Sequence, residues 1–145
     1  FIVDDTRAPV PEDIVPQLQR LIDADRRSDA VRLFMKIVGV PAVFIALMRF
    51  MPAWSKLKGV AHTLPYDLTI VSDNQRGRPL PVTRWTAARV PTLVVAGGKS
   101  PAWMRNAMQA LARVLPSATH RTLEGQTHMV NAKKLAPVLA EFFGN

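Results

Sequence analysis

One histidine of this chain lies in a setting that suits proton transfer. His128 ends the polar stretch LEGQTH, residues 123–128, which separates a short apolar segment from an amphipathic one. An imidazole with its ordinary pKa of ~6.5 can accept a proton and return it near neutral pH. His128 could therefore transfer a proton, and the alternative is a loop histidine of no special role. His62 and His120 are expected to have no catalytic role, and His120 is expected to face outward from a strand.

The serines of the chain do not include a convincing nucleophile. Ser100 lies in the sequence GKSPA, residues 98–102, which nearly matches the G-x-S-x-G pattern of a nucleophile elbow. The elbow uses the backbone N–H of the residue after the serine to stabilise an oxyanion, and Pro101 has no N–H. A phosphate-binding loop is not expected either, because Leu93 occupies the place of its first glycine. We expect Ser100 to be a helix N-cap rather than a nucleophile.

Hydrophobic periodicity predicts two strands and two helices in the last third of the chain. Residues 92–96 form an apolar, β-branched run followed by two glycines, which is typical of a strand buried on both faces. A helix follows to about residue 115, and a second strand covers residues 119–123. The last helix has a stripe of large apolar side chains, each of which gains ~1.5–3 kcal/mol on burial. These are Leu135, Val138, Leu139, Phe142 and Phe143.

The two strands should form a parallel pair, because a helix connects them. A parallel sheet of two strands cannot cover both of its faces or pair both of its edges. Apart from residues 1–3, the upstream sequence looks almost wholly helical, since prolines and glycines divide it into short helices at residues 12–25, 28–38, 41–51 and 54–64. Ser28 is the expected N-cap of the second helix. Residues 66–73 fit either a helix or a strand, and residues 74–81 fit a loop.

The loop before His128 resembles the histidine loop of α/β-hydrolases, in which a glycine-containing polar loop follows a late parallel strand. Residues 90–95, VPTLVV, are similar to the next-to-last strand of that family. The resemblance implies a partial α/β-hydrolase fold whose parallel sheet is completed by a missing N-terminal half. Residues 1–8 would form the exit from the sixth strand, residues 9–88 a helical cap, and residues 89–145 the C-terminal part of the core.

The resemblance also implies the chemistry of a serine hydrolase. His128 would take the proton of a serine hydroxyl that the N-terminal half supplies together with the oxyanion hole. The acid is absent from the place where most of the family has it, because residues 97–100 contain no carboxylate. Some relatives place the acid after the sixth strand, so Asp4 and Asp5 are candidates, with a turn or helix-entry role as the alternative; the acid can also lie before Phe1.

The substrate pocket of this family lies between cap and core. The candidates to line it are Trp54, Trp103, Met104 and Met129, with core packing as the alternative for the first three. The apolar cap favours a small, apolar-leaning ester, lactone or amide.

The composition limits the classes of partner. The formal charge is +8, but the basic residues are scattered and do not alternate with aromatic ones, so no nucleic-acid partner is expected. The chain has no cysteine, and no metal or other cofactor is expected. No signal peptide is visible, and the most apolar stretch, residues 37–50, is interrupted by Pro41 and too short for a membrane span. We expect a cytoplasmic protein.

Two alternatives to the hydrolase hypothesis stay open. The missing carboxylate fits a non-catalytic relative that binds a small hydrophobic molecule under its cap. The positive charge fits a basic interaction module with no catalytic ancestry. The hydrolase hypothesis itself requires two partners: the N-terminal half, from the same gene or a second chain, and a small-molecule substrate.

Overall fold

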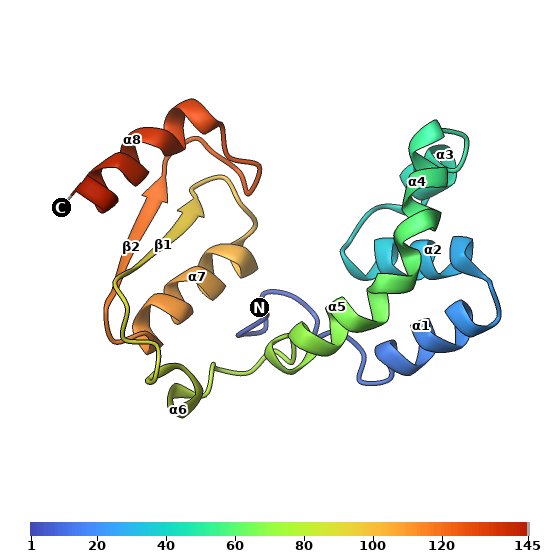
Figure 1. Cartoon of the computed structure of the whole chain (residues 1–145), viewed down its shortest axis with the longest axis horizontal. Helices are drawn as coiled ribbons and strands as arrows, with labels where there is room; N and C mark the ends of the chain where they lie inside the picture. The colour runs from blue at the N-terminus through green and yellow to red at the C-terminus, as the bar shows by residue number, and fades with distance from the viewer. Residues whose placement is uncertain (145) are drawn as a thin grey trace. The chain divides into compact units, whose positions relative to one another are not determined.

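The computed structural model describes residues 1–144, and these residues form two compact units (Figure 1). One unit combines residues 1–9 with residues 74–144, and the other, the helical unit, is Val10–Asp73. The helical unit is shorter than the expected cap of residues 9–88. Residues 74–88 join the first unit because Leu80 and Trp85 pack in one apolar cluster with Val3.

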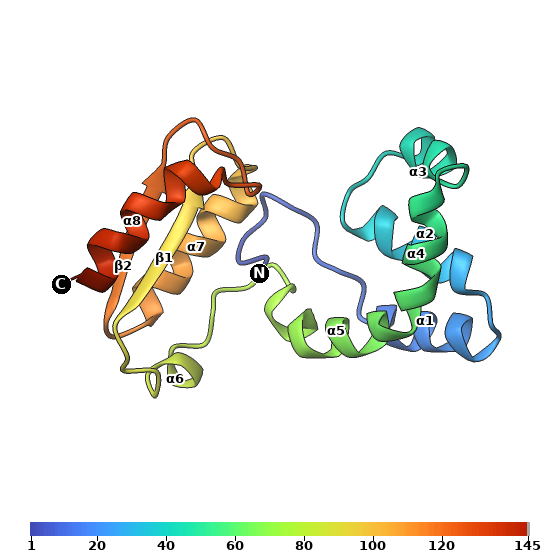
Figure 2. The same cartoon turned by 45° about the horizontal axis from the view of Figure 1, so that its top comes forward.

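The first unit contains the predicted strand–helix–strand–helix order. Strand β1 (Thr92–Gly97) and strand β2 (Ala118–Leu123) pair in parallel, with Thr92 opposite Ala118 and Gly97 opposite Leu123. Helix α7 (Ala102–Val114) connects the strands, and helix α8 (Ala132–Gly144) follows β2. The two helices lie on opposite faces of the strand pair (Figures 1 and 2). A short helix, α6 (Val82–Trp85), precedes β1.

The two faces of the strand pair are buried to different extents. On the α7 side, Val94 and Ala96 of β1 and Ala107 of α7 are buried. His120 lies opposite Val94 and shares this face, with its Nε2 shielded from solvent, so the expectation that it faces outward was wrong. Alternation along the strand puts Leu93 and Val95 on the other face, where they are only half-buried.

Helix α8 lacks the burial that its apolar stripe requires. None of its residues is fully buried among the described part of the chain, and Phe143 is 78% exposed. Within residues 1–144, β1 pairs with β2 alone, so its second edge has no strand beside it. The described chain therefore leaves both an apolar helix face and a strand edge without a partner.

The helical unit consists of short helices, as the proline and glycine pattern predicts. Its elements, with two 3-10 turns, are α1 (Ile14–Asp23), α2 (Arg27–Ile37), α3 (Ala42–Met48), α4 (Pro52–Val60), η1 (Ala61–Thr63), α5 (Leu64–Val71) and η2 (Ser72–Asn74). Residues 66–73, for which helix and strand were both open, are thus helical. Ile14 and Leu18 lie one turn apart on α1 and are fully buried.

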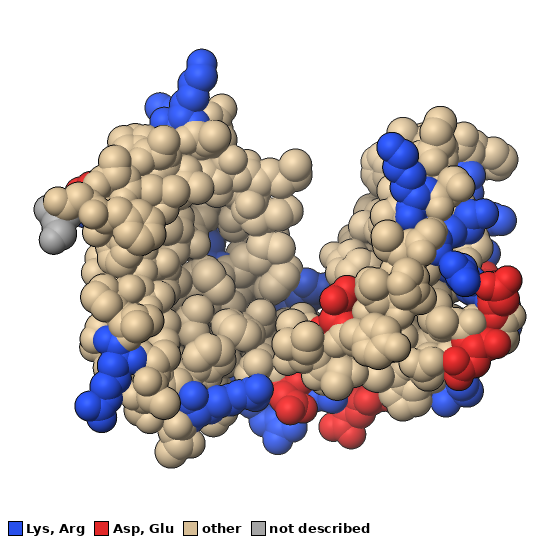
Figure 3. All heavy atoms as spheres, viewed as in Figure 1, with Lys and Arg blue, Asp and Glu red and all other residues tan. Residues whose placement is uncertain are grey.

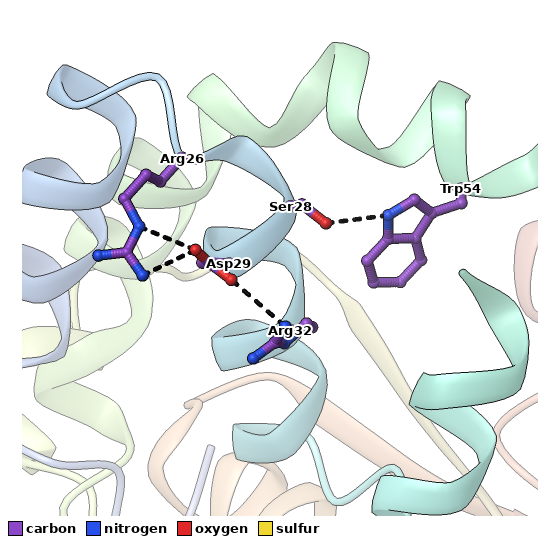
Figure 4. A network of polar contacts seen from close by, with 5 residues as sticks. All are labelled: Arg26, Ser28, Asp29, Arg32 and Trp54. Atoms are coloured by element: carbon purple, nitrogen blue, oxygen red, sulfur yellow. Dashed lines mark hydrogen bonds and ion pairs between the residues drawn. The ribbon is translucent and has the colours of Figure 1, made fainter. Parts of the chain in front are cut away.

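Ser28 is not the N-cap of α2, contrary to expectation. The helix begins at Arg27, and the Ser28 hydroxyl accepts a hydrogen bond from Nε1 of Trp54 at 3.1 Å (Figure 4). Asp29 pairs with Arg26 at 2.8 Å and with Arg32 at 3.4 Å on the same helix end. The hydroxyl therefore satisfies a tryptophan N–H rather than the helix backbone.

The surface carries its charges in separate groups. On the face shown in Figure 3, Lys and Arg side chains form separate groups, one of them over the helical unit, rather than one continuous stripe. No helix in residues 1–144 combines the length and the apolar character needed to cross a bilayer. Nor do the His, Asp and Glu side chains of these residues gather into a group that could hold a metal ion.

Candidate active site

His128 lies in the loop that joins β2 to α8. The register of the sheet places the carboxyl ends of β1 and β2 side by side, because Gly97 is opposite Leu123. The loop starts there with a turn at Gly125, whose φ of +74° lies in the left-handed region that favours glycine. His128 is therefore presented at the edge of the sheet where both strands end.

The histidine loop packs directly on the end of β1. A Cβ atom at Gly97 would lie 2.5 Å from the carbonyl oxygen of Thr127 and 2.6 Å from that of Gln126. Two backbone hydrogen bonds join the same segments, from the Gly98 N–H to Leu123 O at 2.9 Å and from the Lys99 N–H to Gln126 O at 2.8 Å. Glycine at position 97 thus allows a backbone-to-backbone contact that any side chain would block.

A pocket of about 310 Å³ opens beside His128. Its walls come from the end of β1, from α7 and from the histidine loop, and most of the lining side chains are apolar. The lining residues include Phe1, Val95, Ser100, Trp103, Met104, Ala107, Met108, His128 and Val130. The His128 side chain is exposed, and its ring has no hydrogen-bond partner within the described residues. The imidazole is free to meet a group that approaches through the pocket.

The structure brings some of the predicted binding residues to this pocket and not others. Trp103 and Met104 line it together with His128, and the Arg7 guanidinium stacks on the Trp103 ring at 4.2 Å. Met129 is 80% exposed and is not among the lining residues. Trp54 is 5% exposed in the core of the helical unit, which matches the alternative of core packing.

Ser100 is a pocket residue that the sequence pattern did not predict. It is 3% exposed and lines the same pocket as His128. The expectation that it caps α7 was wrong, since Pro101 occupies the N-cap position and makes no side-chain cap. The Ser100 carbonyl instead accepts a hydrogen bond from Nη1 of Arg105 at 2.7 Å. A strand-to-helix junction of this kind could have suggested a pocket position from the sequence.

Asp4 is the better fixed of the two acid candidates. One of its carboxylate oxygens accepts hydrogen bonds from the hydroxyl and backbone N–H of Thr6, and the other accepts one from Nδ2 of Asn106 at 2.6 Å. The bonds from Thr6 and then from Asn106 lower the pKa of the Asp4 carboxyl below its usual range. Asp5 is exposed, and neither aspartate lines the pocket of His128.

Replacing Asn106 by alanine should raise the pKa of Asp4 towards its ordinary value, because the charged form loses a donor. A depressed native pKa stabilises the fold above the pKa of the unfolded chain, and this contribution disappears as the pH falls through the native pKa. The variant should therefore be less stable than the wild type at pH 7, and the difference should shrink in acid. Carboxyl NMR titration measures the pKa of Asp4, and urea unfolding measures the stability at each pH.

An unchanged Asp4 pKa in the alanine variant would contradict this account. The control is Gln109→Ala, at an exposed position on α7.

Comparison with known proteins places this arrangement in a wider context. No family model matches the chain, and no curated protein sequence matches it. Among solved structures, the crystal structure of an α/β-hydrolase from Sphaerobacter thermophilus DSM 20745 matches it with a TM-score of 0.80 and 46% identity. The match covers 99% of this chain and 55% of that chain, so the chain spans little more than half the length of the solved hydrolase. The chain therefore has a partial α/β-hydrolase fold, as its histidine loop and its apolar strand had indicated.

Proposed function

We propose that this chain is part of a serine hydrolase in which it supplies the general base, His128, and a helical cap, Val10–Asp73. The observation that supports the proposal is the placement of His128. A loop fixed by backbone contacts to Gly97 and Lys99 holds it at the carboxyl ends of both strands, beside an apolar pocket. General-base catalysis requires such a fixed imidazole with an open nitrogen.

In the proposed reaction, a serine from outside this chain attacks the carbonyl carbon of the substrate. His128 accepts the hydroxyl proton during the attack and donates it to the leaving group when the tetrahedral intermediate collapses. It then activates the water that hydrolyses the acyl-enzyme. Asp4 and Asp5 are the acid candidates that this chain offers for orienting the imidazole. The serine, its oxyanion hole and the remaining strands are assigned to an N-terminal half.

The pocket supports a small, apolar-leaning substrate. Its volume of about 310 Å³ is at the lower end of the range for ligand sites, and Met104, Ala107 and Met108 give it an apolar wall. We expect the complete protein to hydrolyse p-nitrophenyl esters of short and medium acyl chains faster than those of long ones. Lactone and amide probes of the same size extend the panel. No turnover of any probe would contradict the proposed function.

A second candidate is a non-catalytic protein that binds a small hydrophobic ligand. The observation in its favour is that the lining of the His128 pocket contains no Asp or Glu from the described residues. Saturable binding of an apolar ester without turnover by the complete protein would support this candidate. The third hypothesis, a basic module without catalytic ancestry, is disfavoured by the 46% identity to a hydrolase.

The chain by itself should associate with other copies or with other proteins. The free edge of β1 and the incompletely buried stripe of α8, with Leu139 and Phe143 exposed, both offer surfaces that gain from pairing or burial. Size-exclusion chromatography with light scattering should show aggregates for the isolated chain and a single 1:1 complex when the N-terminal half is co-expressed. A folded, monodisperse monomer of the isolated chain would contradict the prediction.

A further inference from the structure

Gln126, which lies in the loop that carries His128, makes three hydrogen bonds. Its backbone N–H donates to Leu123 O at 3.2 Å, and its carbonyl oxygen accepts the Lys99 N–H at 2.8 Å. Its side-chain Oε1 accepts the backbone N–H of Asn131 at 3.1 Å. The residue therefore joins β2, the segment after β1 and the start of α8.

The side-chain bond of Gln126 spans His128. It connects position 126 with position 131, so residues 126–131, which include His128, form a backbone ring closed by this hydrogen bond. The far end of this ring is fixed as well, because Oδ1 of Asn131 accepts the N–H of Lys133 at 2.8 Å in the first turn of α8. Inside the ring, the Thr127 hydroxyl accepts the N–H of Met129 at 3.2 Å.

The orientation of His128 depends on this backbone ring. The imidazole has no hydrogen-bond partner of its own within residues 1–144, and the side chain is exposed. Nothing in the described chain therefore fixes the ring nitrogens directly. We propose that Gln126 is a positioning residue that holds the His128 imidazole beside the pocket, an inference that rests on the proposed role of His128 as the general base.

Within residues 1–144 the side-chain amide of Gln126 forms a hydrogen bond only as an acceptor, so its two closest analogues should behave differently. Methionine has the same length but lacks a strong acceptor, whereas glutamate keeps an acceptor oxygen at the same distance from the backbone. In the complete protein, Gln126→Met should lower kcat for ester hydrolysis by about 10²-fold, with KM within about twofold of the wild type, because the base is misplaced while the pocket walls from β1 and α7 are unchanged. Gln126→Glu should recover most of this loss.

The glutamate variant provides a second readout. A carboxylate two residues from His128 favours the protonated imidazole, so the acidic limb of the kcat/KM profile should move to higher pH. The shift would show that the side chain at position 126 lies close to the imidazole in the active protein. Gln109→Ala, an exposed glutamine on α7, is the matched control and should leave kcat and the pH profile unchanged.

NMR of the His128 imidazole separates failure of this inference from failure of the proposed function. In the complete protein, the imidazole signals should shift and broaden in Gln126→Met and keep their wild-type position in Gln109→Ala, whether or not esters are turned over. If Gln126→Met does not fold, Gln126→Ala replaces it in both measurements. Wild-type kcat with an unchanged imidazole spectrum in the methionine or alanine variant would overturn the inference, as would a glutamate variant as slow as methionine.

Discussion

Replacing His128 by alanine in the complete protein should lower kcat for ester hydrolysis by about 10⁴- to 10⁶-fold. Without the imidazole, no group takes the proton of the attacking serine or returns it to the leaving group. What activity remains should come from substrate binding and the oxyanion hole alone. Steady-state kinetics with a p-nitrophenyl ester measure the loss in kcat, and any pre-steady-state burst of nitrophenol under excess substrate should disappear.

His62→Ala is the matched control for this experiment. His62 lies in the helical unit, where Nδ1 of its ring is 3.1 Å from the carbonyl oxygen of Gly59, and it has no place in the proposed chemistry. The control variant should keep its turnover. Equal rates for His128→Ala and the wild type would reject the catalytic role and leave the ligand-binding candidate.

Replacing Gly97 by alanine should lower kcat by about 10²-fold, because the added methyl group would displace His128 while leaving its imidazole intact. The new methyl group would meet the carbonyl oxygens of Thr127 and Gln126 at 2.5 and 2.6 Å. Both obstacles are backbone atoms, so the histidine loop must move as a whole. We also expect a loss of roughly 1–3 kcal/mol in the free energy of unfolding, as for other overpacked sites. Ester kinetics and urea unfolding of the complete protein measure the two effects.

Gly59→Ala makes the same chemical change where there is room for it. No heavy atom lies within 4 Å of a Cβ at Gly59, which is inside α4. Alanine should stabilise this helix by about 0.5–1 kcal/mol and leave turnover unchanged. If Gly97→Ala behaved like Gly59→Ala, the close contact between β1 and the histidine loop would not matter for the site.

The fold of the last third of the chain could be predicted because its signals are local and strong. The β-branched run of β1, the following glycines and the apolar stripe of α8 each indicate one element with little ambiguity. Uncovered apolar surface could also be predicted, because a parallel sheet of two strands cannot cover both of its faces. Phe143, which remains 78% exposed, illustrates that point in the structure.

Other features depend on contacts between residues that are far apart in the sequence, and hydrophobic periodicity does not contain that information. Ser28 and Ser100 both have the chemistry of an N-cap, but one meets Trp54 and the other lines the pocket. The boundary of the helical unit at Asp73 follows from the packing of Leu80 and Trp85 with Val3, far apart in sequence. The close approach at Gly97 likewise needs three dimensions, since the sequence shows only a glycine after a strand.

The bond from Gln126 to Asn131 ties the histidine loop to the first turn of a helix that is itself poorly buried. A displacement of the first turn of α8 should therefore be passed on to the backbone that carries His128.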